Sequence, residues 1–170
     1  MPFDVASVRA PFPSVAEGGA HFDGPGGSQV PDVVGRAIAD TVTAAISNRG
    51  TFTPSERRAD AVVADFRSAY ADFLGADPRG IVHGRSATAL TYDFSRTLAK
   101  NWGPGDEIVV TRLDHDSNVR PWVQAAQSAG ATMRWVDFDP ATGELTADAV
   151  AAVVTERTRL VATTAASNLI

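Results

Sequence analysis

The stretch that most constrains this chain is IVHGRSATALTYDFSRTLAKN, residues 81–101. Residues 81–83 predict a short buried strand, Gly84, Arg85 and Ser86 form a turn, and a helix is expected from Ala87 onward. A helix that starts in this way leaves several backbone N–H groups unpaired, and together with the helix dipole they favour an anion, most often a phosphate. We expect the turn to hold the phosphate of a cofactor, with the Thr88 hydroxyl in the first helical turn. The alternative is that Ser86 is only the N-cap of an ordinary strand-to-helix turn.

The remaining pattern alternates between helices and strands. Two helices are predicted before the turn, at 31–47 and 55–74, with Ser55 as the candidate N-cap of the second and Gly75 as its end. Three more strands are predicted at 107–111, 132–136 and 158–163, separated by helices at 119–129 and 146–154. Strands that alternate with helices of this length predict an α/β fold whose parallel sheet is covered on both faces. The first 20 residues show no clear period and are expected to form an irregular arm.

Composition excludes several classes of function. The chain has 170 residues and a formal net charge of -5, and it shows no basic stripe of the kind that binds nucleic acid. It has no cysteine, which rules out disulfides, thiolate nucleophiles and cysteine-ligated zinc within these residues. The three histidines lack metal-ligand spacing, so no metal site is expected. There is no apolar run near the ~20 residues of a membrane span and no signal-like start, so we expect a cytoplasmic protein.

Three small polar clusters follow predicted strands, and ligands of parallel sheets collect beyond the carboxyl ends of the strands. They are residues 84–88, 114–118 and 166–168. In the second cluster, His115 is a candidate to stack on an aromatic cofactor or to move a proton. The alternative is that the cluster only starts the next helix, with Asp116, Ser117 or Asn118 as its cap. The only lysine, Lys100, lies at a helix end, where a structural role is expected.

Taken together, the clusters resemble the N-terminal part of the class V aminotransferase family of pyridoxal phosphate (PLP) enzymes, and most closely its cysteine desulfurase-like branch. The segments that carry the resemblance are residues 21–31, 48–50, 85–89, 105–110, 114–118, 121–122 and 158–168. They cover almost the whole chain in the order of the family. The resemblance implies a three-layer α/β fold with a mostly parallel sheet, namely the N-terminal portion of the PLP-dependent transferase major domain. Residues 1–30 would form an N-terminal arm with a small-residue loop, and residues 31–170 a partial PLP-binding large domain.

The resemblance also implies roles for individual residues. Ala87 and Thr88, next to Ser86, would bind the cofactor phosphate. His115 would stack on the pyridine ring as the catalytic histidine, and Asn168 would hydrogen-bond the phenolic oxygen of the ring. Enzymes of this kind act on a small-molecule amino-acid substrate through a Schiff base, usually as homodimers. A cysteine desulfurase-like lyase or transferase is therefore the expected activity, with no nucleic acid or membrane as partner.

Several positions depart from the family pattern. Ala89 replaces a glutamate of the phosphate turn, and Ala165 replaces a histidine a few residues before Asn168. The matched residues end before the positions of the Schiff-base lysine and of the aspartate under the ring nitrogen, so we expect these 170 residues to be a fragment that is inactive by itself. Two alternatives stay open, a catalytically degenerate dimerisation or scaffold module and a nucleotide-binding α/β enzyme. The turn at 84–88 lacks the glycine fingerprint and the P-loop lysine that the second alternative calls for.

Overall fold

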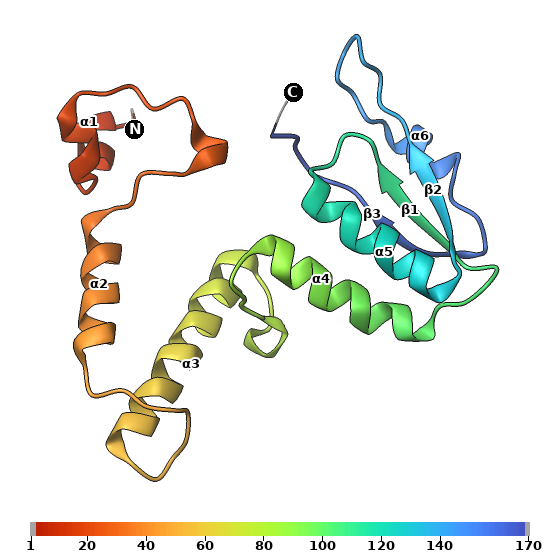
Figure 1. Ribbon diagram of the computed structural model, residues 1–170. Coiled ribbons are helices and arrows are strands. Elements are labelled where there is room, and N and C mark those ends of the chain that lie inside the picture. The colour runs from red at the N-terminus through yellow and green to blue at the C-terminus, as the bar shows by residue number, and fades with distance from the viewer. Residues whose placement is uncertain (1–2, 169–170) are drawn as a thin grey trace. The chain divides into compact units, whose positions relative to one another are not determined.

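The computed structural model describes residues 3–168 (Figure 1). The chain divides into two compact units, residues 1–82 and residues 83–170, and each is considered by itself. This division concerns compactness alone. The predicted boundary between an arm (1–30) and a cofactor domain (31–170) therefore stays a prediction.

The first unit is helical. Its elements are α1 (Val5–Arg9), η1 (Pro13–Glu17), η2 (Gly24–Gly26), α2 (Asp32–Thr43), α3 (Pro54–Leu74) and η3 (Pro78–Gly80). The short helix α1 lies in the segment for which an irregular arm was expected, and the carboxylate of Asp4 caps it by accepting hydrogen bonds from two backbone N–H groups. Both long predicted helices are present, and α2 ends at Thr43, four residues before the predicted end.

Helix α3 begins one residue earlier than predicted, and its N-cap is Thr53 rather than Ser55. The Thr53 hydroxyl accepts a hydrogen bond from the Glu56 N–H at 3.2 Å, and the Glu56 carboxylate accepts one from the Thr53 N–H at 2.9 Å. This reciprocal capping box satisfies two backbone donors at once, which a single cap at Ser55 does not. Gly75 ends the helix in the left-handed conformation, with φ of 62°, as predicted.

The second unit is an α/β structure. Its elements are α4 (Ala87–Leu98), η4 (Ala99–Asn101), β1 (Glu107–Thr111), η5 (Asp116–Asn118), α5 (Arg120–Ala129), β2 (Thr132–Val136), α6 (Ala147–Ala151) and β3 (Thr158–Ala162). The strands form a parallel sheet in the order β2-β1-β3, so β1 is central and the three strands end at the same edge (Figure 1). The predicted α/β class with a parallel sheet is confirmed.

The strand predicted at residues 81–83 is wrong, because the backbone from 81 to 84 forms no β-ladder. Ile81 is buried, as the apolar run indicated, but its N–H donates to the Pro78 carbonyl of η3 at 3.3 Å. An apolar run of three residues is compatible with any buried segment, so hydrophobicity alone does not specify a strand there. The turn before α4 is therefore held by α4 itself and not by a preceding strand.

The core of this unit lies between β1 and α5. Ile108, Val110, Trp122, Ala126 and Ala162 form one buried cluster, to which β1 and β3 contribute from the sheet and α5 from above it. All five residues of β1 are buried, because the strand has a neighbour on each side. Within residues 3–168, β2 and β3 each pair with β1 only, so the outer edges of both strands carry no strand partner.

At the amino-terminal edge of the sheet, opposite to the edge where the three strands end, a buried carboxylate forms hydrogen bonds to residues in β2 and just before β3. Glu107, the first residue of β1, is 3% exposed and accepts hydrogen bonds from Arg157 at 2.7 Å and from the Thr155 hydroxyl at 2.8 Å. Arg134 of β2 donates a further one at 3.3 Å. These donors stabilise the charged form and lower the pKa of Glu107 from 4.5 to about 2.

Candidate functional site

The turn before α4 forms the first part of the site. Ser86 is the N-cap of α4, and its hydroxyl accepts a hydrogen bond from the Ala89 N–H at 3.1 Å. Its carbonyl accepts the first intrahelical bond, from the Leu90 N–H at 3.1 Å. The amides of Ala87 and Thr88 precede these two donors, so the helix itself offers them no acceptor. Two main-chain donors and the Thr88 hydroxyl thus sit at the positive end of a 12-residue helix.

Gly84 allows this turn to approach α4 closely. A Cβ atom built on Gly84 would lie 2.7 Å from both Cγ and Cδ2 of Leu90, well inside van der Waals contact. Leu90 lies one helical turn after Ser86, so the glycine lets the backbone fold back against the first turn of the helix. The close packing against Leu90 therefore explains why a residue without a side chain stands at position 84.

The loop after β1 carries His115, which caps the short helix η5. Its Nδ1 accepts a hydrogen bond from the Ser117 N–H at 3.1 Å and lies 2.8 Å from the Ser117 hydroxyl. A backbone N–H can only donate, so Nδ1 holds a lone pair and the neutral ring carries its proton on Nε2. The residue as a whole is exposed to solvent. The alternative of a capping region is correct in that the cluster starts the short helix η5 at Asp116, but none of Asp116, Ser117 and Asn118 caps α5, which begins at Arg120 without a side-chain cap.

Asn168 follows β3 and is exposed. The residues just before it, from Thr163 to Ser167, line a hollow of about 410 Å³, together with Leu113 from the loop after β1 and Val150 of α6. The segment that leads to Asn168 therefore borders a recess at the carboxyl edge of the sheet. Asn168 itself does not line this hollow.

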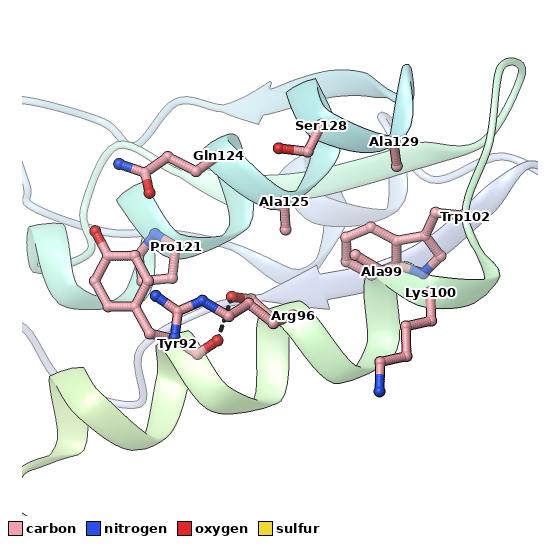
Figure 2. A pocket seen from close by; sticks show the side chains of 11 residues that line it. Tyr92, Arg96, Ala99, Lys100, Trp102, Pro121, Gln124, Ala125, Ser128 and Ala129 are labelled. Carbon is pink, nitrogen blue, oxygen red and sulfur yellow. Dashed lines mark hydrogen bonds between the residues drawn. The ribbon is translucent and has the colours of Figure 1, made fainter.

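Helices α4 and α5 run in the same direction. The turn before α4 therefore lies at the end of the unit where α5 begins, which is the carboxyl edge of the sheet. Figure 2 shows Tyr92 beside Pro121 at one end of a cavity of about 360 Å³, and Ala99 near Ala129 at the other. Thr88 precedes Tyr92 by four residues, so it lies about 6 Å beyond the start of α5, at the level of η5. Contacts between α4 and η5 agree with this placement.

The five predicted site residues therefore group at one end of the second unit. Ser86, Ala87 and Thr88 belong to the start of α4, His115 to the loop after β1, and Asn168 to the segment after β3. None of them lines the open cavity between α4 and α5, which residues of α4, η4 and α5 border together with Trp102. Their roles toward a cofactor stay predictions.

Two residues near His115 are tied into the structure in a way that the sequence analysis did not predict, although it considered Asn118 as a helix cap. Asp114 accepts hydrogen bonds from Thr111 and from Asn118, and Asn118 accepts one from the indole of Trp122. The only available signal was the spacing of an acid, an amide and a tryptophan at positions 114, 118 and 122. Among residues 3–168, no three carboxylate or histidine side chains are grouped to hold a metal ion. No helix in the same range combines the length and apolar character needed to cross a bilayer.

The chain was compared with known proteins. The family model of aminotransferase class-V matches residues 20–170. The chain belongs to this family. Its enzymes depend on pyridoxal phosphate, and the expected resemblance is confirmed.

Individual relatives point to the same branch. An uncharacterized protein of Mycobacterium tuberculosis is 39% identical over 98% of this chain, and a probable cysteine desulfurase of Mycolicibacterium paratuberculosis is 34% identical over 98%. The cysteine desulfurase CsdA of Escherichia coli superposes on 94% of the chain with a TM-score of 0.78 and 26% identity. The chain covers 42%, 25% and 41% of these three proteins, respectively, so it spans less than half of each.

The donor set at the start of α4 fits the cofactor of the family. A phosphate needs main-chain N–H donors and a hydroxyl at a helix N-terminus, and Ala87 and Thr88 supply them. An aromatic ring can stack on the flat side chain of the exposed His115. The Nδ1 atom of this side chain already accepts a hydrogen bond from the Ser117 N–H. The group of residues is thus chemically suited to a phosphorylated aromatic compound.

Proposed function

We propose that these residues supply the phosphate-binding and ring-stacking part of the cofactor site in a PLP-dependent enzyme of the cysteine desulfurase-like kind, acting on an amino acid. The observation that carries the proposal is the common location of the α4 N-terminus and the His115 loop in a chain of the class V family. PLP supplies the chemistry of such an enzyme by withdrawing electrons from the α-carbon of the amino acid.

The residues of the chain have separate tasks in this proposal. The amides of Ala87 and Thr88 and the Thr88 hydroxyl hold the phosphate. Ser86 caps the helix through the Ala89 N–H, which leaves the Ala87 and Thr88 amides available to the phosphate. His115 covers one face of the pyridine ring, and its Nε2–H is available for proton transfer to or from the substrate. Asn168 donates a hydrogen bond to the phenolic oxygen of the ring.

We further propose that the 170 residues are a fragment that binds PLP by itself too weakly to retain it on dialysis. The support is that the family's Schiff-base lysine has no counterpart among the matched positions, while Lys100 lies in η4, at the far end of the helical segment that begins with Ser86. An amine placed there is remote from a ligand held at the first turn of α4.

The expected result is that the chain mixed with PLP loses its visible absorption on dialysis. Lys100→Ala is expected to behave in the same way, and the measurement is the absorption spectrum before and after dialysis. A band that survives dialysis in the wild type and disappears in Lys100→Ala would contradict the proposal, because it would show that this lysine anchors the cofactor.

A homodimer in the cytoplasm is proposed as the working form. Helix α2 supports the dimer, because it exposes an apolar face that includes Ile38, 60% exposed, and Val42, 74% exposed. Apolar groups in such a row are usually covered by another chain. Sedimentation velocity should show a concentration-dependent dimer that Ile38→Glu weakens at least about tenfold, since the buried charge is costly. A wild-type monomer at every concentration tested would contradict the proposal, and Asp40→Ala serves as a control on the same helix.

A further inference from the structure

A series of three side-chain hydrogen bonds connects the end of β1 to α5 across the loop that carries His115. The hydroxyl of Thr111 donates to one carboxylate oxygen of Asp114. The Asn118 side-chain NH₂ donates to the other oxygen at 2.7 Å, and the Trp122 indole N–H donates to the Asn118 carbonyl oxygen at 3.1 Å. All polar atoms of the Asp114 carboxylate and the Asn118 oxygen are thus engaged.

Both ends of this hydrogen-bonded series are buried. Thr111 is fully buried as the last residue of the central strand, and Trp122 is 7% exposed within the core cluster. Asp114 and Asn118, the two inner members, are half-buried and flank His115 on either side in sequence. Hydrogen bonds to a carboxylate that is shielded from water are stronger than those at the surface. The loop is therefore fixed from the strand on one side and from the helix on the other.

His115 makes no comparable contact of its own. Its ring nitrogen Nδ1 is hydrogen-bonded to Ser117, which lies inside the segment that Asp114 and Asn118 bracket, and its backbone carbonyl accepts from the Asn118 N–H at 2.8 Å. The position of the Ser117 N–H thus decides which ring nitrogen accepts and how the ring is turned. A displacement of that segment releases both the tautomer and the orientation of the imidazole.

We propose that Asp114, held by Thr111 and Asn118, is a positioning residue that sets the tautomer and orientation of His115. It acts through Asn118 and Ser117 and touches no substrate or cofactor itself. The use of an oriented His115 for stacking on the PLP ring rests on the proposed function, whereas the positioning itself does not depend on any ligand.

The geometry separates two variants of the same residue. Asp114→Ala removes both acceptors and leaves the Asn118 NH₂ without its partner. Asp114→Asn keeps both links, since its oxygen accepts from Asn118 and its NH₂ donates to Thr111, whose hydroxyl rotates to accept. Asp116→Ala is the matched control, because Asp116 is an acid of the same loop whose exposed side chain pairs with the exposed Arg120, at 2.8 Å.

The test is nuclear magnetic resonance on the unliganded chain, which reads the His115 tautomer from its ring ¹⁵N shifts and the hydrogen exchange of the Ser117 amide. Asp114→Ala is expected to mix the two tautomers and to speed Ser117 exchange by about tenfold, the equivalent of one lost hydrogen bond. Asp114→Asn and Asp116→Ala are expected to keep the wild-type tautomer and exchange rate. Trp122→Phe removes the outermost donor together with part of the buried ring volume but leaves Asp114, Asn118 and Thr111 in place, so it should give a smaller effect of the same kind and serves if Asp114→Ala does not fold.

An unchanged tautomer and exchange rate in Asp114→Ala, or in Trp122→Phe if only that variant folds, would overturn the proposal. An equal change in Asp116→Ala would overturn it too, because any disturbance of the loop would then suffice. A titration with pyridoxine 5′-phosphate, which has no reactive aldehyde, separates the two ideas. If the wild type does not bind this compound while the unliganded variants behave as expected, the proposed function fails and the positioning role stands.

Discussion

Ile108→Ala is expected to lower the free energy of unfolding of the unit 83–170 by about 2–5 kcal/mol, the usual cost of a large-to-small change in a packed core. Ile108 is fully buried in the central strand and belongs to the cluster with Trp122 and Ala126. The methyl groups that are lost leave a cavity between the sheet and α5, where neither element can easily move inward.

The measurement is urea unfolding followed by tryptophan fluorescence. All three tryptophans of the chain, at positions 102, 122 and 135, lie in this unit, so the signal reports on it alone. Val161→Ala is the matched control, because Val161 lies on an outer strand and is 40% exposed. Its cost should stay below about 1 kcal/mol. Equal losses for the two variants would show that the space between β1 and α5 is not the core.

Glu107→Gln is expected to lower the melting temperature strongly at pH 7 and hardly at all near pH 2. The folded chain holds the pKa of Glu107 at about 2, against 4.5 for the ordinary group. At pH 7 the carboxylate is charged in both states, and its hydrogen bonds to Arg157, Thr155 and Arg134 stabilise only the folded one. As the pH falls below 4.5 the unfolded chain takes up a proton first, so this stabilisation is lost progressively down to about pH 2.

The check is the difference in melting temperature between wild type and Glu107→Gln across this range of pH. That difference isolates Glu107, since the other acids titrate in both proteins. Glu156→Gln, at an exposed position next to Arg157, should show little difference from wild type at any pH. A gap for Glu107→Gln that is the same at pH 7 and pH 2.5 would mean that the arginine contacts do not depend on the charge of residue 107.

The sequence predicted the regular elements well where local signals were strong. The bounds of β1 and β2 agree with the prediction, because each strand follows a glycine-containing turn and β1 contains the apolar run 108–110. Gly130 ends α5 with φ of 72°, as expected of a glycine after a helix. Which strands pair with one another was harder to predict from the sequence. Residues 81–83 form no β-ladder although Ile81 and Val82 are apolar, and only the tertiary structure reveals whether a neighbouring strand is available.

The candidate site likewise contains contacts that the sequence predicts and contacts that it does not. The cap at Ser86 is a local interaction over three residues, and the sequence predicts it directly. The role of Asp114 depends on the approach of a strand end to a helix start, which no periodicity encodes. Likewise, the choice of His115 rather than a neighbouring acid as the cap of η5 depends on the path of the loop after Thr111.

The central claim is that the start of α4 and the His115 loop bind one phosphorylated ring. The most direct measurement is a titration of the ¹⁵N-labelled chain with pyridoxine 5′-phosphate, with unphosphorylated pyridoxine as control. We predict that the phosphorylated compound shifts the amides of Ala87 and Thr88 together with the His115 ring signals at millimolar concentration, and that pyridoxine leaves the two amides unchanged. Shifts confined to other parts of the chain, or shifts of Ala87 and Thr88 without His115, would contradict the claim.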